Sequence, residues 1–187
     1  VDPFKEWERI SIADACRKYA GFDLESTLPA EPTLEPDPAP LAKAAEKLGI
    51  QVSPDDRWDD IYFRIAFEKI EPNLGRGVPT ILYDYPVCMA ALSRKKPSDP
   101  RFAERFEVYV GDTELGNAFS ELTDAAEQRR RFEYDMDLKE KLYGERYPVD
   151  DDFINAVAAM PEAAGIAVGV DRLVMLITGA KRIEDAM

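Results

Sequence analysis

Hydrophobic and polar residues alternate most clearly between positions 104 and 122. Phe106, Val108 and Val110 are separated by single residues of other types, which is the period of two expected for a strand with one apolar face. The dipeptide Gly-Asp follows at 111–112 and is typical of the two-residue turn of a β-hairpin. The pattern therefore predicts two antiparallel strands that meet at this turn.

Apolar residues at helical spacing predict helices in other parts of the chain. Ser11 is a candidate N-cap for the first helix, and Gly21 is a candidate for its end. A short strand, TILYDYP, is expected to end at Pro86, because proline has no N–H to donate to a sheet. Further helices are expected at 41–48, 56–70, 124–142 and 150–159.

The segment 165–179 is typical of a strand that runs directly into a helix. Gly165, Ala167 and Gly169 alternate and would leave one strand face almost free of side chains, so that a flat ring or small ligand can approach the backbone. The alternative is a small-residue strand packed tightly against a helix. The other strand face is expected in a core, and it carries Ile166, Val168 and Val170.

The helix of this segment begins near two charged residues. Asp171 is the expected N-cap and Gly179 the expected end. Arg172 would lie near the positive end of the helix, where a guanidinium can hold a phosphate or stack on a base. The glycine spacing and the order of elements do not match the dinucleotide-binding fingerprint GxGxxG.

Composition and charge exclude or disfavour several classes of protein and site. The 187 residues include 24 Lys+Arg and 37 Asp+Glu, a net charge of −13. This charge disfavours sequence-independent binding to a nucleic-acid phosphate backbone. The chain has no histidine, which excludes serine–histidine and cysteine–histidine hydrolases. Two cysteines without a CxxC motif predict no disulfide scaffold and no zinc site, and favour the cytoplasm. We expect no transmembrane segment and no signal peptide.

Two polar segments are expected to have structural roles only. Residues 25–40 contain five prolines and several acidic residues, so they predict an extended linker. The run Arg129–Arg131 lies in the charged 124–142 segment, and it predicts a solvated helix face rather than a phosphate clamp.

The predicted hairpin places two carboxylates near each other. With the turn at 111–112, Tyr109 pairs with Glu114 and Glu107 pairs with Gly116. Glu107 and Glu114 then become diagonal neighbours on one face, about 7–8 Å apart. Two carboxylates without histidine suit a hard cation such as Mg²⁺, which keeps waters and binds substrate phosphates. The alternative is an exposed hairpin face with two solvated glutamates.

Strict alternation places Asn117 and Glu121 on the face opposite Glu114. They join the same site only if the strand bulges, and Gly116 is the expected position of the bulge. Glu121 would then offer a negative group to a substrate ammonium, and Asn117 a directional hydrogen bond. The alternative is ordinary polar surface.

Two motifs carry a resemblance to a known family. The segments ERFEVYVGDTELGNAFSELTDAAEQ and GIAVGVDRLVML resemble the core strand pair and motif 3 of class II aminoacyl-tRNA synthetases of the lysine branch. Within it, the chain is more similar to the truncated paralogues that ligate lysine to elongation factor P, on the segments IEPNLGRGVPTILYDYP, ELTDAAEQRRRFEYD and YPVDDDFINAV. Ala167 supports this, because ordinary lysyl synthetases usually have glycine there.

The resemblance implies a fold, an activity and site roles. It implies an α+β class with an antiparallel sheet flanked by helices, and ATP-dependent activation of lysine or β-lysine with Mg²⁺, followed by transfer to elongation factor P. The implied metal ligands are Glu107 and Glu114. The implied ATP contacts are Glu114, Leu115, Gly169 and Arg172, with Arg172 as the catalytic residue. The implied amino-acid contacts are Asn117, Glu121 and Ala167.

The chain also departs from the family pattern. Motifs 1 and 2 are not found, so residues 1–187 are expected to be the C-terminal part of a catalytic domain, with a small helical insertion at about 41–75. The complete protein is expected to be a homodimer, and the isolated chain inactive. Ala118 replaces a glycine of the family and is expected to crowd the pocket. Two alternatives are a fragment of a conventional synthetase acting on lysine tRNA and a non-catalytic binding module.

Overall fold

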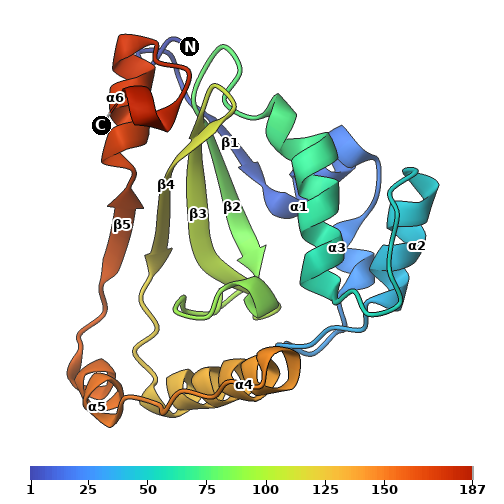
Figure 1. Ribbon diagram of the computed structural model, residues 1–187, viewed down its shortest axis with the longest axis vertical. Helices are drawn as coiled ribbons and strands as arrows, with labels where there is room; N and C mark the ends of the chain where they lie inside the picture. Colours follow the sequence, from blue (N-terminus) through green and yellow to red (C-terminus); the bar gives the residue numbers. More distant parts are fainter. Residues whose placement is uncertain (187) are drawn as a thin grey trace.

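A computed structural model describes residues 1–186 and contains a five-stranded sheet with the order β1-β2-β3-β4-β5 (Figure 1). β1 and β2 are parallel, and each later pair is antiparallel. This confirms the predicted α+β class with a largely antiparallel sheet. The strands are Glu8–Ser11, Thr80–Pro86, Phe102–Val110, Thr113–Ser120 and Ala164–Val168.

Helices surround this sheet on one face and at both ends. Figure 1 shows α1, α2 and α3 beside the strands β1 to β3, α4 across one end of the sheet, and α6 at the other end next to β5. α1 and α3 continue as π-helical turns at Cys16–Ala20 and Ala66–Ile70. The α-helices are Ile12–Ala15, Ala39–Lys47, Trp58–Ile65, Ala125–Tyr143, Asp151–Ala159 and Val170–Thr178.

The main core lies between the sheet and the helices α1 to α3. Trp58, Ile61 and Ile65 of α3 are at most 1% exposed, and they belong to one cluster with Leu82 of β2 and Tyr109 of β3. Burying each such side chain contributes about 1.5–3 kcal/mol. The predicted helix at 56–70 therefore belongs to the core beside the sheet, and α2, predicted at 41–48, packs against α3.

Most helix ends lie where the sequence predicts them. The hydroxyl of Ser11 accepts a hydrogen bond from the backbone N–H of Asp14, and Gly21 and Gly179 are left-handed residues that end their helices. The prediction for Asp171 was wrong. Gly169 is the N-cap of α6, and Asp171 lies within the first turn, where its negative charge still complements the helix dipole.

The arginine run on α4 is not a uniform solvated face. Arg129 pairs with Asp151 and Arg130 with Glu127, as expected, but the Arg131 side chain is only 1% exposed. Its guanidinium donates to the backbone carbonyls of Ala90 and Ser93 and to Glu127. Arg131 therefore joins α4 to the loop after β2 through hydrogen bonds. The charge pattern alone could not show that Arg131 is buried while Arg129 and Arg130 are solvated.

Glu127 compensates this buried arginine, and we expect its replacement to destabilise the fold. Lys95, Arg130 and Arg131 surround its carboxylate, and their hydrogen bonds outweigh the opposing effect of burial and lower its pKa from 4.5 to about 2. Because the pKa is depressed in the folded state, the stabilisation is present at neutral pH and is lost as the pH falls from about 4.5 towards 2. Glu127→Gln should lower the free energy of unfolding by about 1–2 kcal/mol at pH 7, because solvent screens part of the attraction.

Urea unfolding of the variant at pH 7 and at pH 3 measures this effect. The difference from the parent chain should shrink at the lower pH. Glu133→Gln on the exposed side of the same helix is the matched control and should change stability by less than about 0.5 kcal/mol. Equal effects of the two substitutions would show that Glu127 does not compensate Arg131.

The apolar residues of β5 and α6 are exposed, which contradicts the expected core. Ile166 is 53% exposed, Val168 47% and Val170 67%. β5 is the last strand of the sheet, and the helices that build the main core lie at the other edge (Figure 1). No described element covers this edge, so the alternation of the strand is correct but its burial is not.

No helix within residues 1–186 combines the length and the apolar character that a membrane crossing needs.

Cys16 and Cys88 are both free thiols, and burial raises the pKa of each to about 12. Neither thiol therefore ionises near neutral pH.

Candidate functional site

A β-bulge in the hairpin brings the predicted site residues onto one face. Tyr109 pairs with Glu114 as expected, but Val108 pairs with Gly116 and Glu107 with Asn117. The predicted pairing of Glu107 with Gly116 was therefore wrong, because the extra residue of the bulge is Leu115. A bulge was expected at Gly116, one residue further along the chain.

The bulge reverses the alternation of side chains in the second half of β4, so residues after Leu115 lie on the face opposite to the one that strict alternation predicts. Asn117 now lies directly across from Glu107 on β3 and from Ala167 on β5. Glu121 follows at the same alternation, and a methyl group added to Gly165 would lie 3.1 Å from its Oε1 atom. Asn117, Glu121 and Ala167 therefore share the face that carries Glu107 and Glu114.

Glu107 is the most buried acidic residue of this face, at 8% exposure. Its Oε1 atom accepts from Arg105 Nη2 at 2.7 Å and from Asn117 Nδ2 at 3.2 Å, and its Oε2 atom accepts from the hydroxyl of Tyr109 at 2.8 Å. A carboxylate offers about four lone-pair positions. Glu107 is thus oriented by three donors and retains limited capacity for another ligand.

Arg172 lies beside Glu114 rather than in a separate part of the molecule. Its Nη1 atom donates to the backbone carbonyl of Glu114 at 2.7 Å and lies 3.5 Å from Glu114 Oε2. The N–H of Gly169 donates to the carbonyl of Leu115 at 2.9 Å. A side chain at Gly169 would contact Arg172, since an added Cβ would lie 3.2 Å from its Cδ atom. The bulge and the start of α6 therefore form one unit.

The carboxylates of the site perturb one another. Burial raises the pKa of Glu114, and the negative charge of Glu107 adds to this, while Arg172 and Arg105 oppose it. Burial also raises the pKa of Glu71, with further contributions from Glu107 and Glu114. The ionised forms of Glu114 and Glu71 are therefore stabilised when a positive charge arrives, which is the electrostatic condition for a cation site.

The donor set fits a magnesium ion that keeps several waters. Within residues 1–186, no group of three or more His, Cys, Asp or Glu side chains is arranged to hold a metal ion. Glu114 is 35% exposed at its side chain and can offer oxygen ligands, and Glu107 lies on the same face of the sheet. Mg²⁺ usually takes one or two carboxylates and completes its octahedron with water and substrate phosphates, so two glutamates suffice.

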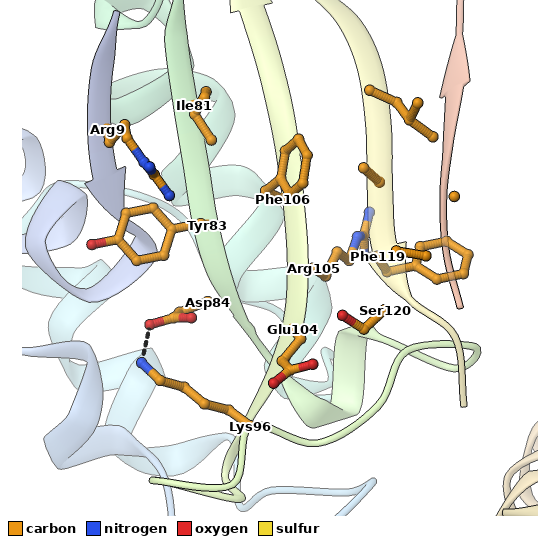
Figure 2. A pocket seen from close by; sticks show the side chains of 14 residues that line it. Arg9, Ile81, Tyr83, Asp84, Lys96, Glu104, Arg105, Phe106, Phe119 and Ser120 are labelled. Atoms are coloured by element: carbon orange, nitrogen blue, oxygen red, sulfur yellow. Dashed lines mark hydrogen bonds and ion pairs between the residues drawn. The ribbon is translucent and has the colours of Figure 1, made fainter. Parts of the chain in front are cut away.

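A broad groove of about 760 Å³ lies on the opposite face of the sheet (Figure 2). Its apolar floor includes Phe106, Ala118 and Ile166, which are register partners across β3, β4 and β5. Asp84 and Lys96 form an ion pair at one side of it. None of the predicted site residues lines this groove, but Arg105, which contacts Glu107 and Asn117, borders it. Ala118 therefore faces away from Asn117, and the expectation that it crowds the pocket was wrong.

Two members of the site network, Arg105 and Tyr109, were not predicted from the sequence. Arg105 contacts Glu107 and Asn117, and Tyr109 binds Glu107 through its hydroxyl. Both lie two residues from Glu107 on β3 and so share its face. That spacing was a usable signal for both residues. Nothing in the sequence indicated which polar groups on the face would bond to each other.

The chain belongs to the class II tRNA synthetases (D, K and N), whose family model matches residues 2–187. It is 39% identical over 183 residues to a lysine–tRNA ligase of Dehalococcoides mccartyi, covering 97% of this chain and 35% of that protein. A lysine–tRNA ligase of Moorella thermoacetica is 36% identical over 188 residues, covering 100% and 36%.

A third relative has a different acceptor in its name. The elongation factor P–(R)-β-lysine ligase of Pectobacterium atrosepticum is 42% identical over 158 residues, covering 82% of this chain and 48% of that protein. The chain thus spans about a third to a half of the length of these relatives. The comparisons confirm the predicted family and its lysine branch.

Proposed function

We propose that this chain is part of an enzyme that activates lysine or β-lysine with ATP and Mg²⁺ to an aminoacyl-adenylate. The observation that carries this proposal is the convergence of Glu114, Asn117 and Arg172 on one face of the sheet through the bulge at Leu115. The names of a lysine–tRNA ligase and of an elongation factor P–(R)-β-lysine ligase among the relatives support lysine or β-lysine as the amino acid that is activated.

The first step needs positioning and charge neutralisation more than acid–base chemistry. A carboxylate oxygen of the amino acid forms a bond to the α-phosphorus of ATP, and the bond from that phosphorus to the bridging oxygen breaks to release pyrophosphate. The attacking carboxylate is already ionised, so no general base is required, in agreement with a chain that has no histidine. Mg²⁺ held by Glu107 and Glu114 would neutralise phosphate charge. Arg172 would stabilise the charge that develops on the α-phosphate.

The amino acid would lie along the bulged strand. Asn117 would offer a hydrogen bond and Glu121 a negative charge to an ammonium group. The methyl of Ala167 lies at the register position opposite Asn117, so it reduces the space next to the amide. We propose that this methyl favours a β-amino acid over the α isomer.

We propose elongation factor P as the acceptor, with lysine tRNA as the alternative. A lysine side chain of the acceptor would attack the adenylate carbonyl and release AMP. Ala167 and the identity of 42% to an elongation factor P–β-lysine ligase support the protein acceptor. The net charge of −13 also makes this part of the enzyme a poor grip for RNA phosphates.

The complete enzyme is proposed to be a cytoplasmic homodimer in which further protein covers the exposed edge of this chain. The exposed side chains of β5 and α6 and the apolar groove on the back of the sheet support this, since monomers rarely leave such patches free.

A transfer assay with the complete protein tests the proposal. The protein is incubated with ATP, Mg²⁺ and labelled α-lysine or (R)-β-lysine, and label is counted on elongation factor P and on lysine tRNA in parallel. We expect label on elongation factor P, with β-lysine preferred. Label on tRNA alone would show that the protein is a conventional lysyl-tRNA synthetase. If neither isomer forms an adenylate, the proposed activity is refuted and the alternative of a non-catalytic binding module is favoured.

A further inference from the structure

Arg105 joins two polar side chains of the candidate site, Glu107 and Asn117, through a single guanidinium. Its Nη2 atom donates to Glu107 at 2.7 Å, its Nε atom donates to Asn117 Oδ1 at 3.3 Å, and its Nη1 atom donates to the carbonyl of Met89. The guanidinium also lies 4.3 Å from the ring centroid of Tyr85. Figure 2 shows the side chain between β3 and β4.

This set of contacts uses what distinguishes arginine from lysine. The planar guanidinium carries five N–H donors in a fixed fork and stacks on aromatic rings, whereas an ammonium is a compact point charge. Three separate acceptors on three nitrogen atoms require the fork. The side chain is only 19% exposed, so solvent does not replace these bonds when they are lost.

The contacts also determine the orientation of the Asn117 amide. Arg105 can only donate, so Asn117 Oδ1 must face it, and the ionised Glu107 can only accept, so Asn117 Nδ2 must face that residue. One Nδ2 hydrogen then remains for a third group. The amide is therefore fixed before any substrate arrives.

We infer that Arg105 is a positioning residue that holds the Glu107 carboxylate and the flip of the Asn117 amide in the arrangement the amino acid and the metal require. The inference rests on the proposed function, because the groups that Arg105 positions are those assigned to the substrate and Mg²⁺. Arg105 itself acts through them and touches neither reactant.

The substitution Arg105→Lys tests the fork separately from the charge. Lysine retains the positive charge next to Glu107 but cannot bind Glu107, Asn117 and the carbonyl of Met89 together. In the complete protein we expect the Kd of the amino acid, measured by isothermal titration without ATP and Mg²⁺, to rise about tenfold. We also expect a matching rise in KM for the amino acid in pyrophosphate exchange, with the KM for ATP changing less than threefold.

A second pair of variants keeps the test decisive. Arg94→Lys is the matched control, because Arg94 also lies beside this sheet and forms a two-nitrogen contact with Glu104 at 2.8 and 2.9 Å, outside the candidate site. It should leave the amino-acid Kd unchanged. Arg105→Gln, if it folds, should weaken amino-acid binding further than Arg105→Lys, because the charge is lost as well.

The outcomes distinguish a failure of the positioning role of Arg105 from a failure of the proposed function. Exchange by the parent protein together with equal amino-acid Kd values for Arg105→Lys, Arg94→Lys and the parent would overturn the positioning role and leave the proposed function intact. A lower melting temperature for Arg105→Lys with an unchanged Kd would also overturn it, since that is a structural role only. Absence of amino-acid binding and exchange in the parent protein would instead refute the proposed function.

Discussion

Arg172→Ala in the complete protein should lower the rate of amino-acid-dependent ATP–pyrophosphate exchange by at least about 100-fold. The guanidinium lies at the start of α6 and contacts both the backbone and the carboxylate of Glu114. Its removal takes away a fixed positive charge that the developing phosphate charge would meet. The loss should fall mainly on kcat, because the interaction is strongest in the transition state.

Arg182→Ala is the matched control for this substitution. Arg182 is exposed and pairs with Glu184 and Asp185 beyond α6. It should change the exchange rate by less than a factor of two, because exposed ion pairs contribute little to stability. If Arg172→Ala retained more than half of the parent rate, Arg172 would not be the catalytic arginine, and the assignment of α6 to the nucleotide site would fail.

Gly75→Ala should destabilise the fold by about 3 kcal/mol or more. Gly75 has a φ of +64°, and an added Cβ would lie 2.4 Å from the carbonyl oxygen of Gly111 in the β3–β4 turn. Its own carbonyl accepts from the N–H of Gly111 at 2.9 Å, and its N–H donates to the hydroxyl of Thr80. An alanine therefore meets both a left-handed backbone and a backbone clash.

Gly77→Ala separates these two contributions. Gly77 has a φ of +82° but nothing within 4 Å of an added Cβ, so the substitution should cost about 1 kcal/mol from the backbone conformation alone. Urea unfolding of both variants measures the difference. Equal losses would show that the turn yields to the added methyl, and that Gly75 does not fix the end of the hairpin.

The elements of the fold were largely predictable because their signals are local. The alternation after position 104 and the Gly-Asp turn defined the hairpin, and Ser11 and Gly179 marked the ends of two helices. These signals depend on a few neighbouring residues, since they arise from backbone conformation and capping. Burial depends on distant elements, so the exposure of Ile166 and the burial of Arg131 could not be predicted in this way.

The candidate site was predictable in composition but not in detail. Its acidic pair, Asn117 and Arg172 were all identified from residue type and spacing. The position of the bulge was wrong by one residue, because a bulge at Leu115 or at Gly116 satisfies the same alternation on either side. Arg105 was missed because its role depends on the Met89 carbonyl and the Tyr85 ring, which belong to another part of the chain.

A structure of the complete protein with a non-hydrolysable lysyl-adenylate analogue and Mg²⁺ would show whether Glu114, Asn117 and Arg172 form one site. We expect the phosphate within hydrogen-bond distance of Arg172, the metal at Glu114, and the amino-acid end beside Asn117 and Ala167. An adenylate bound instead in the groove of Phe106 and Ile166 on the other face of the sheet would contradict it.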